Sequence, residues 1–178
     1  MAGPGVEPAP GLGAGGEHGG SPGRRRFLAD AAARGLTVEL VERMAAHSLE
    51  EAAAILGITP RDIVKSLVVK HKDGSFLFAL IPGDRQISWP KLRQLVGVNK
   101  LSLPSADVAL AATGYERGTI TPLGSTTDWP VYADSTVAGR RISMGAGEHG
   151  YSAFVEADAL LDSLAAVVAD ITEPANPS

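Results

Sequence analysis

Residues 63–82 read IVKSLVVKHKDGSFLFALIP, and this stretch decides the fold class. Two apolar runs rich in β-branched and aromatic side chains, residues 63–71 and 75–82, flank the pair Asp73-Gly74. Aspartate followed by glycine supplies the backbone conformation of a tight turn between antiparallel strands. The stretch therefore predicts a β-hairpin.

Lys65 is the residue of this hairpin that most clearly suggests chemistry. Alternate residues of a strand share a face, which places Lys65 among Ile63, Leu67 and Val69. An ammonium on an apolar face must reach water, lose its proton or find an anion, because unpaired burial costs several kcal/mol. Lys65 is therefore either a pocket lysine that binds a substrate phosphate or carboxylate, or a strand lysine whose head reaches solvent.

Short helices and strands alternate irregularly around the hairpin. Ser48 and Glu51 form a capping-box pattern, and Ser88 precedes a helix with Pro90 in its first turn. The patterns predict helices over residues 27–34, 48–56, 89–96, 105–113 and 158–171, and strands over 37–43, 100–103, 131–133, 140–144 and 151–155. This order is typical of an α+β fold with a mixed sheet rather than a doubly wound fold.

Composition separates a tail from a domain. Of the 21 glycines in the 178 residues, nine lie in residues 1–23 together with four prolines. Residues 1–26 are therefore predicted to be a disordered tail, residues 27–172 one domain, and residues 173–178 a C-terminal tail. The chain has no cysteine, which excludes a disulfide framework, a thiolate metal site and a thiolate nucleophile.

Charge and targeting patterns bear on partners and location. The net charge is -4, yet residues 61–141 carry eleven basic and seven acidic side chains. This basic middle is either a surface that meets an anion or chance scatter of charges on a solvated surface.

Residues 24–26 are three arginines, as in a twin-arginine export signal, but Asp30 and Arg34 interrupt the apolar stretch such a signal needs. No apolar run approaches the ~20 residues that span a bilayer. We expect a cytoplasmic protein without a membrane partner.

Two glycine-rich segments are candidate ligand loops. The first glycine loop, residues 114–124, reads GYERGTITPLG, and the second glycine loop, residues 145–150, reads GAGEHG. Such loops let backbone amides approach an anion or a developing oxyanion, or they turn a corner. The second matches G-x-G-x-x-G, but the helix and acidic residue of a dinucleotide site do not follow it. His149 lies in that loop and Asp134 follows a predicted strand; each either lines a pocket or has a purely structural place.

Conventional catalytic machinery is sparse. The four histidines show no metal-ligand spacing, and neither a G-x-S-x-G elbow nor a phosphate-binding G-x-x-x-x-G-K motif occurs. These observations predict neither a metal nor an organic cofactor.

A set of loose motifs in a specific order carries a family resemblance. The order is Ser48 with residues 51–57 (EAAAILG), residues 63–67 (IVKSL), 81–84 (IPGD), the first glycine loop, 131–134 (VYAD) and 143–147 (SMGAG). Over residues 37–171 the chain resembles the YbaK/ProX family of aminoacyl-tRNA deacylases, which is related to the editing domain inserted in bacterial prolyl-tRNA synthetases.

The resemblance implies a fold and an activity. The fold would be a curved mixed sheet, a partly closed barrel, flanked by helices. The activity would be hydrolysis in trans of mischarged tRNA such as Cys- or Ala-tRNA(Pro), with the tRNA acceptor end and prolyl-tRNA synthetase as partners. One departure stands out: the family often has a basic residue shortly after the second loop's G-x-G, where this chain has Glu148 and His149. Because an aminoacyl ester is already activated, positioning and oxyanion stabilisation could suffice.

The resemblance also implies site residues. Lys65 falls on the motif lysine, and Gly118 with Pro122 falls on the G-x-x-x-P loop. Lys65 and Gly118 are the expected catalytic residues, and the expected substrate-binding residues are Lys65, Tyr115, Gly118, Pro122, Gly124, Asp134, Gly145, Gly147 and His149. Two other functions stay open: a non-catalytic module of the same fold that binds tRNA or a synthetase, and a small nucleotide- or metabolite-binding protein.

Overall fold

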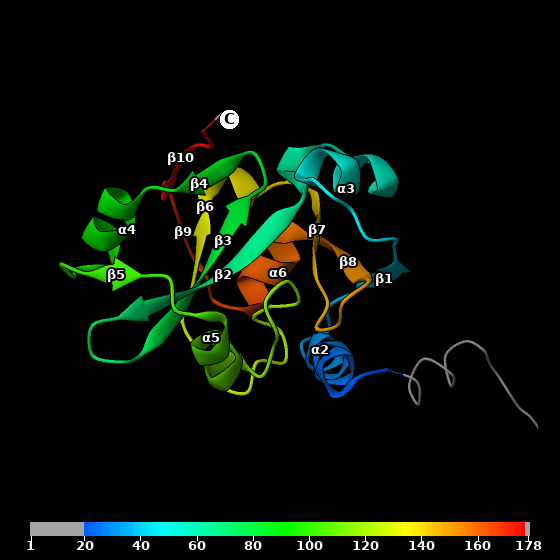
Figure 1. The fold of residues 1–178 in the computed structure, drawn as a ribbon, viewed down its shortest axis with the longest axis horizontal. Helices are drawn as coiled ribbons and strands as arrows, with labels where there is room; N and C mark the ends of the chain where they lie inside the picture. Colours follow the sequence, from blue (N-terminus) through cyan, green and yellow to red (C-terminus); the bar gives the residue numbers. More distant parts are fainter. Residues whose placement is uncertain (1–19, 177–178) are drawn as a thin grey trace, which may run out of the picture.

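The predicted hairpin is confirmed and forms the centre of a five-stranded sheet (Figure 1). In the computed structural model, which describes residues 20–176, β2 (Val64–His71) pairs antiparallel with β3 (Phe76–Pro82). The strand order is β5-β2-β3-β6-β9. Here β5 is Leu101–Ser102, β6 is Val131–Asp134 and β9 is Val167–Ala169, and β6 and β9 run parallel to their neighbours.

The remaining strands form two smaller sheets. β1 (Glu39–Glu42), β8 (Tyr151–Glu156) and β7 (Arg141–Gly145) pair antiparallel in that order, and β4 (Arg85–Ile87) pairs with β10 (Thr172–Pro174). The α+β class is confirmed, but the expected partly closed barrel is wrong. Within residues 20–176, the five- and three-stranded sheets are joined by one parallel bridge, between Ile63 and Ser143, after which β2 and β7 separate.

Within residues 20–176, five α-helices and two 3₁₀ turns cover the sheets. The helices are α2 (Pro22–Ala33), α3 (Leu49–Leu56), α4 (Trp89–Val96), α5 (Ala106–Thr113) and α6 (Ala157–Ser163), and the turns are η2 (Pro60–Asp62) and η3 (Ser135–Val137). Ser48 caps α3 as predicted, because its side chain accepts from Glu51 N at 3.0 Å. Ser88 precedes α4 but makes no side-chain cap bond. None of the helices in this range is long and apolar enough to cross a membrane.

The last predicted helix is largely wrong. The sequence predicts a helix over residues 158–171, whereas α6 ends at Ser163 and the chain returns as β9 and β10. Ala165 adopts a left-handed φ of 52°, which ends the helical path. The β-branched valines that follow then pair with β6 instead of continuing the helix.

Regular structure extends beyond both ends of the expected domain. α2 begins at Pro22, with the Ser21 side chain accepting from Arg24 N at 3.2 Å, so residues 22–26 are helical rather than part of a tail. β10 likewise extends to Pro174. The predicted disorder of residues 1–19 and the tail residues 177–178 lie outside the described residues.

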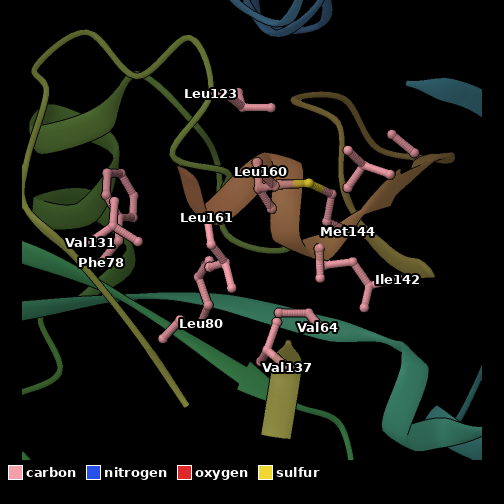
Figure 2. Packing of buried hydrophobic residues seen from close by; sticks show 14 of the residues in the cluster. Val64, Phe78, Leu80, Leu123, Val131, Val137, Ile142, Met144, Leu160 and Leu161 are labelled. Atoms are coloured by element: carbon pink, nitrogen blue, oxygen red, sulfur yellow. The ribbon is translucent and has the colours of Figure 1, made fainter. Parts of the chain in front are cut away.

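The five-stranded sheet separates two hydrophobic cores. The first core lies between this sheet, β7, β8 and α6; Figure 2 shows Leu160 beside Met144 and Leu161 above Leu80. The second core lies on the α4 side and contains Val69, Leu77, Leu92 and Ile171. Successive residues of β2 therefore face different cores, as its alternating pattern predicts.

Asp134 joins the sheet to the C-terminal strands. It is 1% exposed, and its carboxylate accepts from Thr136 N at 3.1 Å, from the Thr136 hydroxyl, and from Ile171 N at 3.0 Å. Burial alone would raise the pKa of Asp134, but these hydrogen bonds outweigh it and the pKa lies below the ordinary value.

We expect Asp134→Asn to lower the free energy of unfolding by about 1–3 kcal/mol at pH 7, because one donor would face an amide NH₂. A carboxylate with a lowered folded-state pKa stabilises the fold above its unfolded pKa of about 3.9, and this stabilisation is lost as the pH falls through the folded pKa. Urea unfolding at a series of pH values should show the wild-type advantage shrinking below about pH 4. The exposed control Asp128→Asn should match wild type throughout; an equally stable Asp134→Asn protein would contradict this role.

Candidate functional site

A cavity of about 520 Å³ lies where β2 and β7 separate. Its lining includes residues 63–68 of the hairpin and residues 143–145 of β7. α3 and α5 supply apolar walls, and the first glycine loop contributes Gly118 and Ile120. The apolar wall residues include Leu49, Ala52, Leu56, Leu103, Ala109 and Met144. Such a concave, mostly apolar space with few polar groups is typical of a small-molecule site.

The charged residues in the lining are all cations. They are Arg43, Lys65 and Arg117, and no aspartate or glutamate among the described residues lines the cavity. Lys65 is partly buried, and its Nζ donates to Arg85 O at 3.2 Å. Burial lowers the pKa of Lys65, an effect that the negative charge of Asp84 partly offsets. The cavity is therefore suited to an anionic or strongly polar ligand.

An unpaired strand edge faces the cavity beside Lys65. His71 N donates to Ser75 O at 2.8 Å, so the odd-numbered residues of β2 direct their backbone groups to β3. Ser66 and Val68 then direct theirs to the opposite edge. Within the described chain, that edge is paired with β7 at the bridge between Ile63 and Ser143 and with β5 from Lys70 onward, and no strand pairs with it in between. The Ser66 hydroxyl is also buried without a hydrogen-bond partner in this range, so a polar strip interrupts the apolar lining.

The first glycine loop is held by α2. Arg26 donates from Nε to Gly124 O at 3.1 Å and from Nη2 to Gly114 O at 2.8 Å. Asp30 accepts from Gly124 N at 2.7 Å. Tyr115 is buried inside the loop and donates to Leu123 O at 2.6 Å; burial raises the pKa of Tyr115 to about 12. These contacts fix the loop that brings Gly118 to the cavity.

The second glycine loop contacts both the first loop and α2. Gly147 N donates to Thr119 O at 3.1 Å. Gly147 also abuts Gly23 so closely that a Cβ on Gly23 would lie 2.3 Å from Gly147 O. Glu148 accepts from Ser21 N at 3.0 Å and lies 3.4 Å from Arg24. The hydrogen bond from Ser21, together with the nearby Arg24, holds the pKa of Glu148 below its ordinary value.

The expected site residues fall into two groups. Lys65, Gly118 and Gly145 line the same cavity although they come from three separate segments. The others lie outside its lining: Tyr115, Pro122, Gly124, Asp134, Gly147 and His149. His149 is exposed, and its Nε2 lies 3.1 Å from Glu116 Oε1, beside Gly118. Among residues 20–176, no group of three or more His, Asp or Glu side chains could hold a metal ion.

Sequence reasoning missed Arg43 and Ser66 as lining residues. Ser66 adjoins Lys65 but points to the opposite face of β2, and the pattern did not reveal that the strand edge beside it is open. Arg43 reaches the cavity because β1 pairs with β8, a long-range contact with no local signal in the sequence.

The model of one protein family matches most of the described residues. It is the aminoacyl-tRNA editing domain, and it matches residues 44–163, which include the hairpin, both glycine loops and every lining residue of the cavity except Arg43. α2 lies before the matched residues.

Curated relatives are proline–tRNA ligases. The ligase of Thermosipho africanus is 37% identical over 89 residues, which are 50% of this chain and 16% of the ligase. That of Kosmotoga olearia is 34% identical over 115 residues, 64% of this chain and 20% of the ligase. The matched part is thus no more than a fifth of the length of these two relatives.

A solved structure provisionally described as a trans-editing enzyme for prolyl-tRNA synthetase has the same fold. It is 28% identical, with a TM-score of 0.79, and the match covers 86% of this chain and 98% of that one. The similarity therefore extends over nearly the whole of that protein.

We expect Gly23→Ala to destabilise the protein by about 1–3 kcal/mol, because the new Cβ would meet backbone atoms of Gly147 that cannot turn aside. In a free helix the same change stabilises by about 0.5–1 kcal/mol. Urea unfolding measures the difference, with the exposed α2 variant Ala32→Ser as control, for which we expect a change within about 0.5 kcal/mol. A Gly23→Ala protein more stable than wild type would show that α2 does not dock as described.

Proposed function

The chain belongs to the aminoacyl-tRNA editing domain family, and we propose that it is a deacylase that hydrolyses the ester of mischarged aminoacyl-tRNA in trans. The products would be free tRNA and the free amino acid. The observation that carries this proposal is the cavity, because Lys65, Gly118 and Gly145 meet there within the residues that the family model matches.

Lys65 is proposed to bind phosphate or ribose oxygens of the acceptor end. Its ammonium has one carbonyl partner, Arg85 O, and no carboxylate within ion-pair distance in the described chain. A partly buried ammonium with so little compensation gains from an anionic ligand. The open edge at Ser66 and Val68 offers further donors and acceptors to the aminoacyl group.

The glycine loops are proposed to stabilise the reacting carbonyl. The Gly118 amide makes no hydrogen bond within residues 20–176, and φ at Gly118 is 92°, a left-handed value that a side chain would strain. Water would attack the ester carbon, and the bond to the ribose oxygen would break as that oxygen takes a proton. A preorganised amide near the developing oxyanion lowers the barrier without any side-chain nucleophile. This chemistry needs no metal or organic cofactor.

The remaining expected residues are proposed to act around this centre. Tyr115, Gly124 and Gly147 maintain the shape of the two loops through the contacts described above. Pro122 stiffens the first loop, and His149 lies beside Gly118 at its exposed side. Asp134, outside the cavity lining, joins β6 to the C-terminal strands through its hydrogen bonds from Thr136 N and Ile171 N.

The substrate is proposed to be tRNA(Pro) carrying a small wrong amino acid, alanine or cysteine. The named relatives are proline–tRNA ligases, and the similar structure is described as acting for prolyl-tRNA synthetase. The apolar walls contributed by α3 and α5 suit a small, weakly polar side chain. The acceptor end would be the direct partner, with prolyl-tRNA synthetase as the source of the mischarged product.

A panel of misacylated tRNAs tests the activity itself. We expect hydrolysis of Ala-tRNA(Pro) or Cys-tRNA(Pro) at rates well above the uncatalysed ester, with Pro-tRNA(Pro) spared. Release of labelled amino acid under single-turnover conditions is the measurement. Binding of tRNA without hydrolysis of any member would instead identify a non-catalytic module.

Lys65→Met tests the proposed role of the lysine. We expect at least a tenfold lower single-turnover rate, because a charged contact to the substrate contributes about 1.5–3 kcal/mol. Since burial lowers the pKa of Lys65, its charge destabilises the folded state at pH 7, so the urea midpoint should stay the same or rise. Lys70→Met, on the same strand but outside the cavity, is the matched control and should keep the wild-type rate. Unchanged turnover in Lys65→Met would remove Lys65 from the mechanism.

A further inference from the structure

Two arginines of the cavity lining, Arg43 and Arg117, have no part in the chemistry described so far. Arg43 follows the last residue of β1, and Arg117 immediately precedes Gly118 in the first glycine loop. They approach the cavity from different segments, and with Lys65 they make its charged lining wholly cationic.

Arg43 is held in place without being neutralised. Its backbone N donates to Gly150 O at 2.9 Å, which fixes it beside the second glycine loop. Its Nε donates to Ser152 Oγ at 3.0 Å, and its Nη1 donates to Met44 O at 3.3 Å. Both acceptors are neutral, and Nη2 has no partner within residues 20–176. The guanidinium is therefore oriented with full charge and with donors to spare.

Arg117 is exposed and makes no hydrogen bond or ion pair within the described part of the chain. No ion pair joins it to its neighbour Glu116 in the described chain, and the Glu116 carboxylate lies 3.1 Å from His149 Nε2 instead. An exposed arginine at the lining of a cavity costs little to keep charged, and it can turn toward a ligand that arrives from solvent.

Glu148 does not cancel these charges either. It stands at the position near which the resemblance leads one to expect a basic residue, yet it is not among the lining residues. Its carboxylate accepts from Ser21 N and lies beside Arg24, at the start of α2. Glu148 thus holds α2 against the second glycine loop, and the cation beside this loop is Arg43.

We propose that Arg43 and Arg117 bind phosphodiester groups of the RNA acceptor end, an inference that rests on the proposed function. A guanidinium offers paired N–H donors that match two phosphate oxygens. RNA presents one such phosphate per nucleotide in every sequence, so these contacts would hold the strand without reading its bases. The arginines would thereby favour esters attached to a polynucleotide over the same ester on a nucleoside.

Two substrates with the same ester distinguish phosphate binding by the arginines from a role at the ester itself. One is alanyl-tRNA(Pro); the other is alanyl-adenosine, which carries the ester but no phosphate. We expect Arg43→Gln and Arg117→Gln each to lower kcat/KM for the tRNA about tenfold, and to leave hydrolysis of alanyl-adenosine at the wild-type rate. Arg93→Gln on α4, outside the cavity lining, is the matched control and should resemble wild type on both.

Salt dependence gives an independent measurement. The plot of log kcat/KM against log salt concentration for the tRNA should lose a slope of about 0.7 for each phosphate contact removed. The Arg93→Gln control should keep the wild-type slope. Unfolding curves for Arg117→Gln and Arg93→Gln should superimpose on wild type. Arg43→Gln loses the hydrogen bonds to Ser152 Oγ and Met44 O, so its free energy of unfolding should fall by about 1 kcal/mol while the protein stays folded under the assay conditions.

Several outcomes would overturn the inference. Equal losses on tRNA and on alanyl-adenosine would place the arginines at the ester, and no loss on tRNA would remove them from recognition. If wild type hydrolyses neither substrate, the proposed function fails. Binding of a short RNA ending in CCA then tests whether the two arginines bind phosphate. Weaker binding by Arg43→Gln and Arg117→Gln, but not by Arg93→Gln, would support that site; equal binding by all would reject it.

Discussion

The backbone contact between Gly23 and Gly147 is the constraint on which the site depends. It lets α2 lie directly on the second glycine loop, and from that position Arg26 and Asp30 reach the first. In the second loop, Gly147 N donates to Thr119 O of the first loop, so α2 and the two loops all contact and stabilise one another. Loops rich in glycine are costly to order. Here the cost is offset by a helix whose Phe27 and Ala31 are buried in the first core.

The site also depends on the separation of β2 from β7, which leaves a strip of polar backbone groups inside an otherwise apolar cavity. A closed barrel would have satisfied the backbone groups of Ser66 and Val68 and filled the gap with side chains. The single bridge at Ile63 and Ser143 instead anchors the two sheets at one end and leaves them apart at the other. The open edge is protected from pairing with another strand because α3 and α5 help to wall the cavity.

Local features of the fold could be predicted from the sequence, and long-range ones could not. The hairpin, the Ser48 cap and the alternation around Lys65 depend on neighbouring residues, and all three occur as expected. The final helix failed because the left-handed turn at Ala165 and the pairing of β9 with β6 override helical spacing. For the site, glycine spacing located both loops but could not show which residues face the cavity. Which residues line the cavity depends on long-range contacts. Tyr115 bonds within the first glycine loop and Gly124 bonds to α2, so neither lines the cavity, whereas the pairing of β1 brings Arg43 to it.

The contact between Gly23 and Gly147 also has an evolutionary consequence. A Cβ at either position would lie within 2.5 Å of backbone at the other, so a side chain at one cannot be accommodated by adjusting rotamers nearby. Substitutions at the two positions are therefore coupled, although most of the chain separates the two residues in sequence. Among relatives that keep this helix, they should vary together or not at all. A lineage that replaces one must also change the angle at which the helix crosses the loop.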